Sequence, residues 1–180
     1  MITIISSTNR TGANTRQVAD IYASLLKDLG EEHQILDLKD LPHDFIFSAL
    51  FENRGSNPEF NETQKLIDET NKFVFIIPEY NGSFPGILKA FLDGLKFPGS
   101  FKGKVGALVG LSAGTMGGSL AMSHLTDILN YLGLFVLPIK PRINNVQKII
   151  SDGKIDDLFI MNLLKEQAEQ LSKFHCQNTM

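Results

Sequence analysis

The sequence predicts an α/β protein with one doubly wound, five-stranded parallel sheet in the order 2-1-3-4-5 and helices on both faces. Short apolar runs alternate along the chain with helical patterns, which is typical of strands joined by crossover helices. The first, third, fourth and fifth runs are apolar on successive residues, as strands buried on both faces are, whereas the second alternates between polar and apolar residues. Glycine-containing loops follow the first, third and fourth runs. Because the carboxyl ends of parallel strands share one edge, we expect these three loops to lie together there.

The first half of the chain contains two predicted strands and two predicted helices. Ile2–Ile5, a β-branched apolar run, is the first strand, and His33–Leu38 is the second. Asn61–Asn71 reads as a short polar helix, whereas residues 41–60 have no clear period. A helix that ends at Gly30 lies between the two strands, and its apolar stripe is Val18, Tyr22, Leu25 and Leu29.

The second half repeats this alternation. Phe73–Ile77, Val105–Leu111 and Leu134–Ile139 are the third, fourth and fifth strands. A helix with Ser83 as its cap and Pro85 in its first turn follows the third strand. The apolar stripes of the three helices in this half are Phe84, Leu88, Phe91 and Leu95; Leu125, Leu129 and Leu132; and Leu158, Met161, Leu164, Ala168 and Leu171. No repeat or long linker divides the chain, so we expect a single domain over residues 1–180.

Composition and charge exclude several classes of protein. The net charge is −3 and basic residues do not cluster, so we expect no nucleic-acid partner. No apolar run is long enough for a membrane span, and residue 2 already begins a strand pattern, so we expect neither a transmembrane helix nor a signal peptide. The only cysteine, Cys176, cannot form an intrachain disulfide, which favours a cytoplasmic protein. The four histidines have no ligand spacing, so we expect no metal site.

The first loop, residues 6–15, has the residues of an anion site. Arg10 offers a charged fork, and Gly12 lets the backbone bend. The helix that follows from about Thr15 presents free amides and the positive end of its dipole. The spacing is neither that of a nucleoside-triphosphatase loop nor that of a dinucleotide fingerprint. A Ser/Thr-rich helix start without a ligand remains an alternative. Hydroxyl donors come from Thr8, Thr11 and Thr15.

The second and third loops suit a flat ring with polar edges, such as an isoalloxazine. Amides around Tyr80, Asn81 and Gly82 can serve one edge of the ring, and those of Ser112–Gly118 the other. Close approach of the backbone to a ring explains the glycines at 82, 114, 117 and 118 better than turn formation alone. Two alternatives stay open: Tyr80 as an ordinary loop tyrosine, and Glu79 as a solvated charge.

The three loops together predict a bound flavin nucleotide. We assign no catalytic side chain, because the flavin itself carries the chemistry. The candidate cofactor-binding residues are Thr8, Arg10, Asn14, Thr15, Pro78, Glu79, Tyr80, Asn81, Gly82, Ser112, Gly114, Gly117 and Gly118.

Three motifs carry a resemblance to a known family over roughly residues 1–140. The chain resembles the NADPH-dependent FMN reductases, flavodoxin-like proteins that include azo-, quinone- and chromate-reductase-like members. It departs from them where Ser7-Thr8-Asn9-Arg10 replaces the usual Gly-Ser-x-Arg, and where Ala13 replaces a serine. The motifs are Arg10 with Thr15; Pro78-Glu79-Tyr80-Asn81 with Pro85-Gly86-x-Leu88-Lys89; and Ser112 with Gly114, Gly117 and Gly118.

The resemblance implies a function. An enzyme of this kind passes hydride from NADPH or NADH through non-covalently bound FMN to a flavin, quinone, azo or similar small acceptor by a ping-pong mechanism. It is also a homodimer or homotetramer, and the apolar segment Phe45–Phe51 either covers a partner surface or caps its own sheet edge. The alternatives are a flavodoxin-type electron carrier that is not an enzyme, and a flavin-free binding or scaffold protein.

Overall fold

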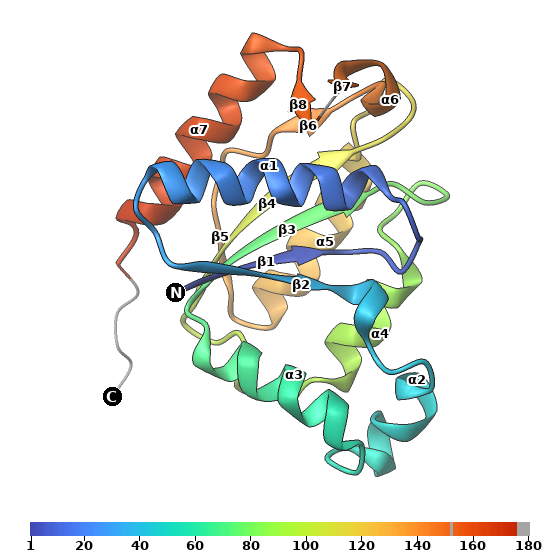
Figure 1. Ribbon diagram of the computed structural model, residues 1–180. Helices are drawn as coiled ribbons and strands as arrows, with labels where there is room; N and C mark the ends of the chain where they lie inside the picture. Colours follow the sequence, from blue (N-terminus) through green and yellow to red (C-terminus); the bar gives the residue numbers. More distant parts are fainter. Residues whose placement is uncertain (152, 176–180) are drawn as a thin grey trace.

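The computed structural model of the protein describes residues 1–151 and 153–175, and in these residues a parallel sheet has the order β2-β1-β3-β4-β5 (Figure 1). This is the predicted strand order, and every pairing along it is parallel. The strands are β1 (Ile2–Ser6), β2 (His33–Asp37), β3 (Lys72–Pro78), β4 (Val105–Leu111), β5 (Phe135–Val136) and β6 (Arg142–Ile143), of which β6 pairs with β4 off this path.

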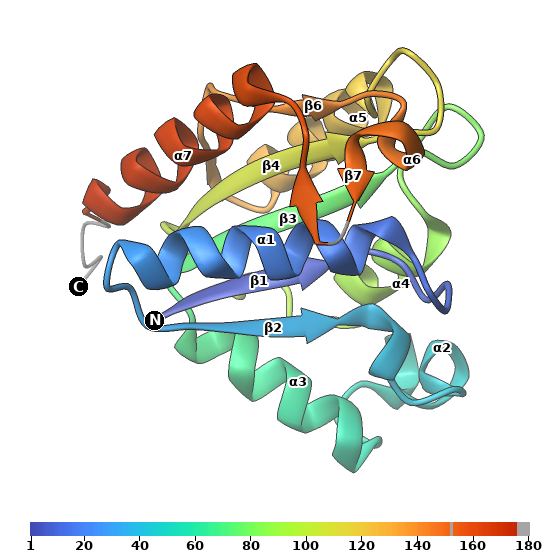
Figure 2. The same ribbon diagram turned by 45° about the horizontal axis from the view of Figure 1, so that its top comes forward.

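Helices cover both faces of the sheet (Figures 1 and 2). On one face lie α1 (Asn14–Asp28) and α7 (Leu158–Lys173). On the other lie α3 (Pro58–Glu69), α4 (Gly86–Gly94) and α5 (Ser119–Tyr131). The short elements are η1 (Leu38–Asp40), α2 (Phe45–Ser48), η2 (Phe51–Asn53), α6 (Val146–Ile149) and the hairpin β7 (Ile150–Ser151) with β8 (Lys154–Ile155).

The central strands are apolar in sequence because helices bury them on both faces. Every residue of β1 and β4 is buried, whereas most of the edge strand β2 is only half-buried. The helical stripes pack on the sheet as predicted, with two exceptions at helix ends. Leu29 is the C-cap of α1 and is 41% exposed, and Leu158 at the start of α7 is 76% exposed. Both positions lie beyond the buried turns of their helices.

The predicted fifth strand, Leu134–Ile139, is wrong in its extent. Only β5 pairs with β4 there, and the chain leaves the sheet at Pro138 before β6 returns to β4. Pro138 has no N–H for a ladder hydrogen bond, and Pro141 follows soon after. The buried side chain of Gln167 on α7 fills the gap: its Nε2 donates to the carbonyl oxygens of Leu108 at 2.9 Å and Ile139 at 2.7 Å.

Two helix starts also differ from the prediction. The polar helix begins at Pro58 rather than Asn61, because Asn57 caps it by accepting a hydrogen bond from the Phe60 amide at 3.0 Å. Ser83 does not cap α4, whose N-cap residue is Pro85. The Ser83 hydroxyl instead lies 3.0 Å from Nδ1 of His124 on α5.

The apolar segment Phe45–Phe51 divides into two kinds of residue. Phe45 and Leu50 are buried against α3 and α4, with the Phe45 ring stacked on Phe60 at 5.4 Å. Phe47 and Phe51 are 82% and 69% exposed. The segment therefore packs in part on its own helices and also leaves two aromatic side chains exposed.

Two further predictions concern the whole chain. Among the described residues, no helix is both long and apolar enough to span a membrane. Cys176 lies outside the described residues, so the cytoplasmic location stays a prediction.

Candidate functional site

The three glycine-containing loops meet at the carboxyl edge of the sheet, which lies on the right in both views (Figure 2). They surround a cavity of about 270 Å³. The topology predicted this meeting, because the loops follow the adjacent strands β1, β3 and β4. The cavity is lined by Arg10, Gly12, Ala13, Asn14, Thr15, Pro78, Glu79, Tyr80, Leu111, Ser112, Ala113, Val146 and Gln147.

The start of α1 forms the part of the cavity that suits an anion. Its N-cap residue, Ala13, makes no side-chain cap hydrogen bond, and no carboxylate lies in the first turn. Among the described residues, the amides of Asn14 and Thr15 donate to no protein acceptor. Free amides at a helix start attract an anion, and the exposed Arg10 adds a positive charge beside them. These groups can hold a phosphate.

One hydrogen bond joins the first loop to the second. The Thr8 hydroxyl lies 2.7 Å from the Tyr80 hydroxyl, and Thr8 Oγ1 also accepts from the Arg10 amide at 3.3 Å. Thr8 is 1% exposed and does not line the cavity. Its side chain therefore positions Tyr80 and Arg10, which do.

The second loop is a tight turn over Tyr80–Ser83. The Tyr80 amide donates to the Ser83 carbonyl at 2.8 Å, and the Ser83 amide donates back at 3.1 Å. Asn81 and Gly82 have φ values of 51° and 76°, as a type I′ turn requires of its central residues. The turn is a sufficient reason for Gly82, and the approach of a ring to this glycine stays a prediction. The Asn81 and Gly82 amides have no acceptor among the described residues, but neither residue lines the cavity, which Tyr80 of the same turn does.

The third loop, Ser112–Gly118, folds against its own strand. Gly117 and Gly118 are buried and do not line the cavity. A Cβ atom on Gly117 would lie 2.8 Å from Cβ of Arg142, and one on Gly118 would lie 2.9 Å from the Leu111 nitrogen. These two glycines therefore allow close backbone packing, not the predicted approach to a ring. Gly114 is exposed with open space around it.

Ser112 holds the third loop in shape. Its hydroxyl accepts from the Gly117 amide at 3.0 Å and donates to the Gly114 carbonyl at 3.0 Å. Its backbone amide donates to the Ile143 carbonyl at 3.0 Å. The side chain thus has partners within the protein, and its role at the cavity is to position the loop.

Sequence reasoning missed the fourth wall of the cavity, Val146 and Gln147 at the start of α6. The Asn145 amide donates to the Gly114 carbonyl at 2.9 Å, and the Val146 amide donates to the Ser112 carbonyl at 3.0 Å. No motif marks this segment in the sequence. The Asn144-Asn145 pair, which makes a turn with Asn145 at a φ of 46°, is the signal that was available.

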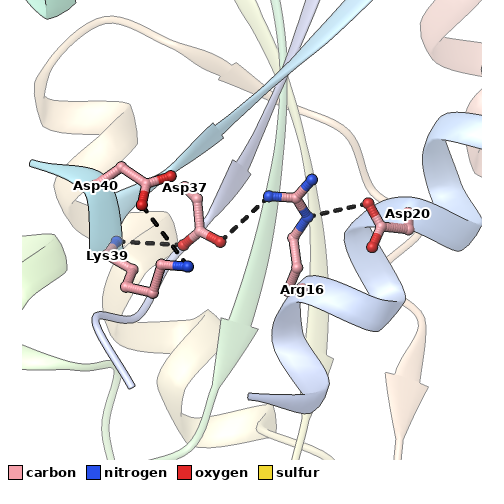
Figure 3. Close-up of polar contacts among 5 residues, drawn as sticks. All are labelled: Arg16, Asp20, Asp37, Lys39 and Asp40. Atoms are coloured by element: carbon pink, nitrogen blue, oxygen red, sulfur yellow. Dashed lines mark hydrogen bonds and ion pairs between the residues drawn. The ribbon is translucent and has the colours of Figure 1, made fainter. Parts of the chain in front are cut away.

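Arg16 ties the first turn of α1 to the end of β2 (Figure 3). Its guanidinium donates to Asp20 at 3.0 Å and to Asp37 at 3.5 Å. The hydrogen bond to Asp20, helped by Asp37, raises the pKa of Arg16 above its usual value. Asp37 is 7% exposed and also accepts from the Lys39 amide. Arg16 therefore fixes the start of α1, and Arg10 is left as the arginine that lines the cavity.

A larger hollow, of about 540 Å³, lies between α4 and α5, away from the three loops. Its walls are mainly apolar, and include Phe51, Leu92, Phe97 and Tyr131. It lacks the free amides of a helix start. The smaller cavity is therefore the better candidate for a nucleotide.

The position of that cavity defines the class of protein. The strand order reverses beside β1, so the switch point of the sheet lies between β1 and β3. The cavity lies at the carboxyl ends of these strands and of β4. Flavodoxin-like proteins bind their nucleotide at this switch point, and this protein is flavodoxin-like.

Comparison with known proteins narrows the class to a family. Residues 1–146 match the NADPH-dependent FMN reductases. An NAD(P)H-dependent FMN reductase of Pseudomonas aeruginosa is 31% identical over 147 residues, covering 79% of this chain and 77% of that protein. A 2-hydroxy-1,4-benzoquinone reductase of Burkholderia sp. is 29% identical over 137 residues, covering 67% and 74%. The solved structure of an NADH:FMN oxidoreductase in its apo form has a TM-score of 0.77 at 19% identity, over 94% of this chain and 87% of that chain.

The chain belongs to the NADPH-dependent FMN reductase family. The protein is therefore an oxidoreductase with FMN as its cofactor and NAD(P)H as its co-substrate. The predicted family, enzyme class and cofactor are confirmed.

Proposed function

We propose that FMN binds in the cavity of about 270 Å³ at the carboxyl edge of the sheet. The observation that carries this proposal is the uncapped start of α1, whose free amides lie beside Arg10. In this arrangement Asn14, Thr15 and Arg10 hold the phosphate. The free amides of Asn81 and Gly82 serve one edge of the ring, and the loop Ser112–Gly118 borders the other.

The protein residues bind and orient the reactants in this proposal. When bound, FMN supplies the chemistry: it accepts hydride from NAD(P)H and passes the reducing equivalents to an acceptor. The turn over Tyr80–Ser83 is fixed by its paired hydrogen bonds and by the Tyr80–Thr8 contact, so it offers its amides without rearrangement. The cavity is near the small end of ligand pockets, and we infer that one face of the bound ring stays accessible to both substrates in turn. That arrangement gives a ping-pong mechanism.

We infer that a quinone-type molecule is the acceptor class, among the flavin, quinone and azo compounds that the resemblance implied. The Burkholderia sp. relative is named as a benzoquinone reductase. A flat acceptor also suits a site that has already admitted a flat nicotinamide ring.

We further propose that the protein assembles as a homodimer or homotetramer. Phe47 and Phe51 are exposed, and Phe51 lines the hollow of about 540 Å³ between α4 and α5. Phe51 also has a φ of 52°, a strained conformation for a bulky residue. Strain that points an aromatic ring outward supports a partner surface at this place.

Steady-state kinetics tests the proposed mechanism. The FMN-loaded protein is assayed with NADPH and NADH against a benzoquinone, an azo dye and free FMN as acceptors. A ping-pong mechanism gives parallel double-reciprocal lines when the nucleotide is varied at several acceptor concentrations. Intersecting lines would mean that both substrates bind together, which contradicts use of one open face.

A further inference from the structure

Lys140 and Arg142 lie between two hollows that share no lining residue with the FMN cavity. Both residues line a hollow of about 500 Å³ beside α5, and both line a second hollow, of about 400 Å³, beside α7. We call these two residues the basic pair. The proposed site above makes no use of them.

The fold holds the basic pair close to the third loop. Arg142 is opposite Gly110 in the pairing of β6 with β4, and the Gly110 amide donates to the Pro141 carbonyl at 3.0 Å. The backbone of Arg142 packs on Gly117, where a Cβ atom would lie 2.8 Å from Cβ of Arg142. Pro138 and Pro141 flank Lys140 and restrict the backbone on both sides. The Arg142 residue is exposed, so its guanidinium can reach a ligand.

The chemistry around the basic pair suits a phosphate. Within residues 1–151 and 153–175, neither cation lies within ion-pair distance of a carboxylate. Each hollow has one acidic residue in its lining: Asp127 in the hollow beside α5 and Asp157 in the hollow beside α7. Asp157 caps α7, because its Oδ1 accepts a hydrogen bond from the Ile160 amide at 3.0 Å. The hollow beside α5 also has hydroxyl groups from Ser119 and Ser123, whereas the Thr126 hydroxyl donates to the Met122 carbonyl at 2.7 Å. Guanidinium and ammonium groups beside hydroxyl donors bind phosphate oxygens well.

The third loop connects this surface to the FMN cavity. Ser112 and Ala113 line the cavity, and Thr115 of the same loop lines the hollow beside α7. A dinucleotide whose nicotinamide lies over the cavity can therefore cross this loop and bring its phosphates to the far side.

We propose that the basic pair binds a phosphate of the nicotinamide nucleotide, either the diphosphate or the 2′-phosphate of the adenosine ribose. This inference rests on the proposed function, since it assigns the second half of the same co-substrate. It makes Lys140 and Arg142 the residues that determine affinity for the nucleotide, with no role in holding FMN.

The test uses the double variant Lys140→Gln/Arg142→Gln. Its control is Lys65→Gln/Lys165→Gln, which removes the same charge from exposed positions on α3 and α7. KM is measured for NADPH, for NADH and for reduced nicotinamide riboside, which has no phosphate. We expect KM for NADPH to rise about tenfold to a hundredfold in the double variant, the effect of losing hydrogen bonds to a charged group. KM for the riboside, kcat and the affinity for FMN stay unchanged, and the control behaves as wild type.

The two nucleotides distinguish the two sources of phosphate. A rise in KM for NADPH alone assigns the 2′-phosphate, and an equal rise for NADH assigns the diphosphate. An unchanged KM for both nucleotides, or an equal rise for the riboside, overturns the proposal.

A binding experiment separates this proposal from the proposed function. Calorimetry of the protein without nicotinamide substrates measures its affinity for 2′,5′-ADP and for ADP. We expect wild type to bind at least one of them, and the double variant to bind it about tenfold or more weakly. Absence of binding by wild type overturns the basic pair as a phosphate site, whether or not FMN is reduced by NADPH.

Discussion

Thr8 and Tyr80 lie 72 residues apart in the chain, and their hydroxyls meet at 2.7 Å. The sequence pointed to both residues as cofactor-binding candidates, but not to their contact with each other. Thr8 is buried and reaches the cavity only through Tyr80 and Arg10. At the scale of single residues, the site therefore depends on a positioning side chain behind the lining residues.

The first residue-scale prediction concerns that contact. Tyr80→Phe removes one hydrogen bond and leaves the Thr8 hydroxyl with fewer partners. We expect the free energy of unfolding, measured by urea denaturation, to fall by about 0.5–1.5 kcal/mol. Tyr131→Phe is the control, because Tyr131 is 77% exposed. Equal stability of the two variants would show that the contact is not formed in solution.

The second prediction concerns the phosphate end of the cavity. Arg10→Ala should weaken FMN binding by about 1–3 kcal/mol, the contribution of a charge-assisted hydrogen bond. FMN binding is followed by quenching of flavin fluorescence. Arg54→Ala is the matched control, because Arg54 lines the other hollow, between α4 and α5. If Arg10→Ala binds FMN as wild type does, the phosphate is held elsewhere.

The third prediction concerns a buried phenol away from the site. Burial raises the pKa of Tyr22, whose hydroxyl has no hydrogen-bond partner among the described residues. The pKa of Tyr22 in the folded protein lies above its value of about 10 in the unfolded chain, so above pH 10 only the unfolded chain loses this proton. The free energy of unfolding is therefore unaffected by Tyr22 below pH 10, and above it falls by up to about 1.4 kcal/mol per pH unit. Tyr22→Phe should abolish this loss and change stability at pH 7 by less than about 1 kcal/mol.

Denaturation curves at several pH values between neutrality and pH 11 check this prediction. Tyr131→Phe should keep the slope of wild type, since Tyr131 is exposed in the folded protein. A slope in Tyr22→Phe as steep as that of wild type would assign the effect to another group.

At the scale of elements, β4 and the loop that follows it pack directly on each other. A Cβ atom on Gly118 would meet the Leu111 nitrogen at 2.9 Å, and one on Gly110 would meet the Gly117 carbonyl oxygen at 2.5 Å. This packing sets where the third loop can reach the cavity. The glycine cluster was visible in the sequence, but the reason for it was not. Arg142 of β6 is distant from the glycines in the sequence, and the end of β4 meets them only because the chain turns back on itself.

The element-scale prediction compares two glycines of similar conformation. Gly118 has a φ of 73° and is crowded, whereas Gly30 has a φ of 74° with open space around it. Gly30→Ala should cost about 1 kcal/mol for backbone strain alone. Gly118→Ala should cost about 1–3 kcal/mol more, because the added methyl group overlaps the backbone of β4. Equal losses in thermal or urea denaturation would argue against the close packing.

Across the whole molecule, local patterns predicted most of the fold. The buried runs of β1, β3 and β4 read as strands, and their order brought the three loops to one edge. The fifth strand was predicted too long although Pro138, which has no N–H for the ladder, was visible in the sequence; the hydrogen bonds from Gln167 that fill the gap are long-range and were not. Val146 and Gln147 were missed for the same reason: tertiary contacts alone bring them to the cavity.

The whole-molecule prediction concerns assembly. Phe51→Asn relieves the strain of a positive φ, which asparagine tolerates, and removes an exposed aromatic ring from the proposed partner surface. Sedimentation should show a shift from oligomer to monomer without loss of monomer stability. Leu158→Asn, at a residue 76% exposed at the start of α7, should leave assembly unchanged. An oligomer that survives Phe51→Asn would place the interface on another surface.

Anaerobic mixing of the FMN-loaded protein with NADPH, and separately with NADH, tests the central claim most directly. The account predicts that the protein binds FMN, becomes yellow, and loses the yellow absorbance when at least one of the nucleotides is added. Arg10→Ala, at the same FMN concentration, should bind less flavin and show a smaller change. A protein that stays colourless with added FMN, or a yellow protein that neither nucleotide bleaches, would contradict the account.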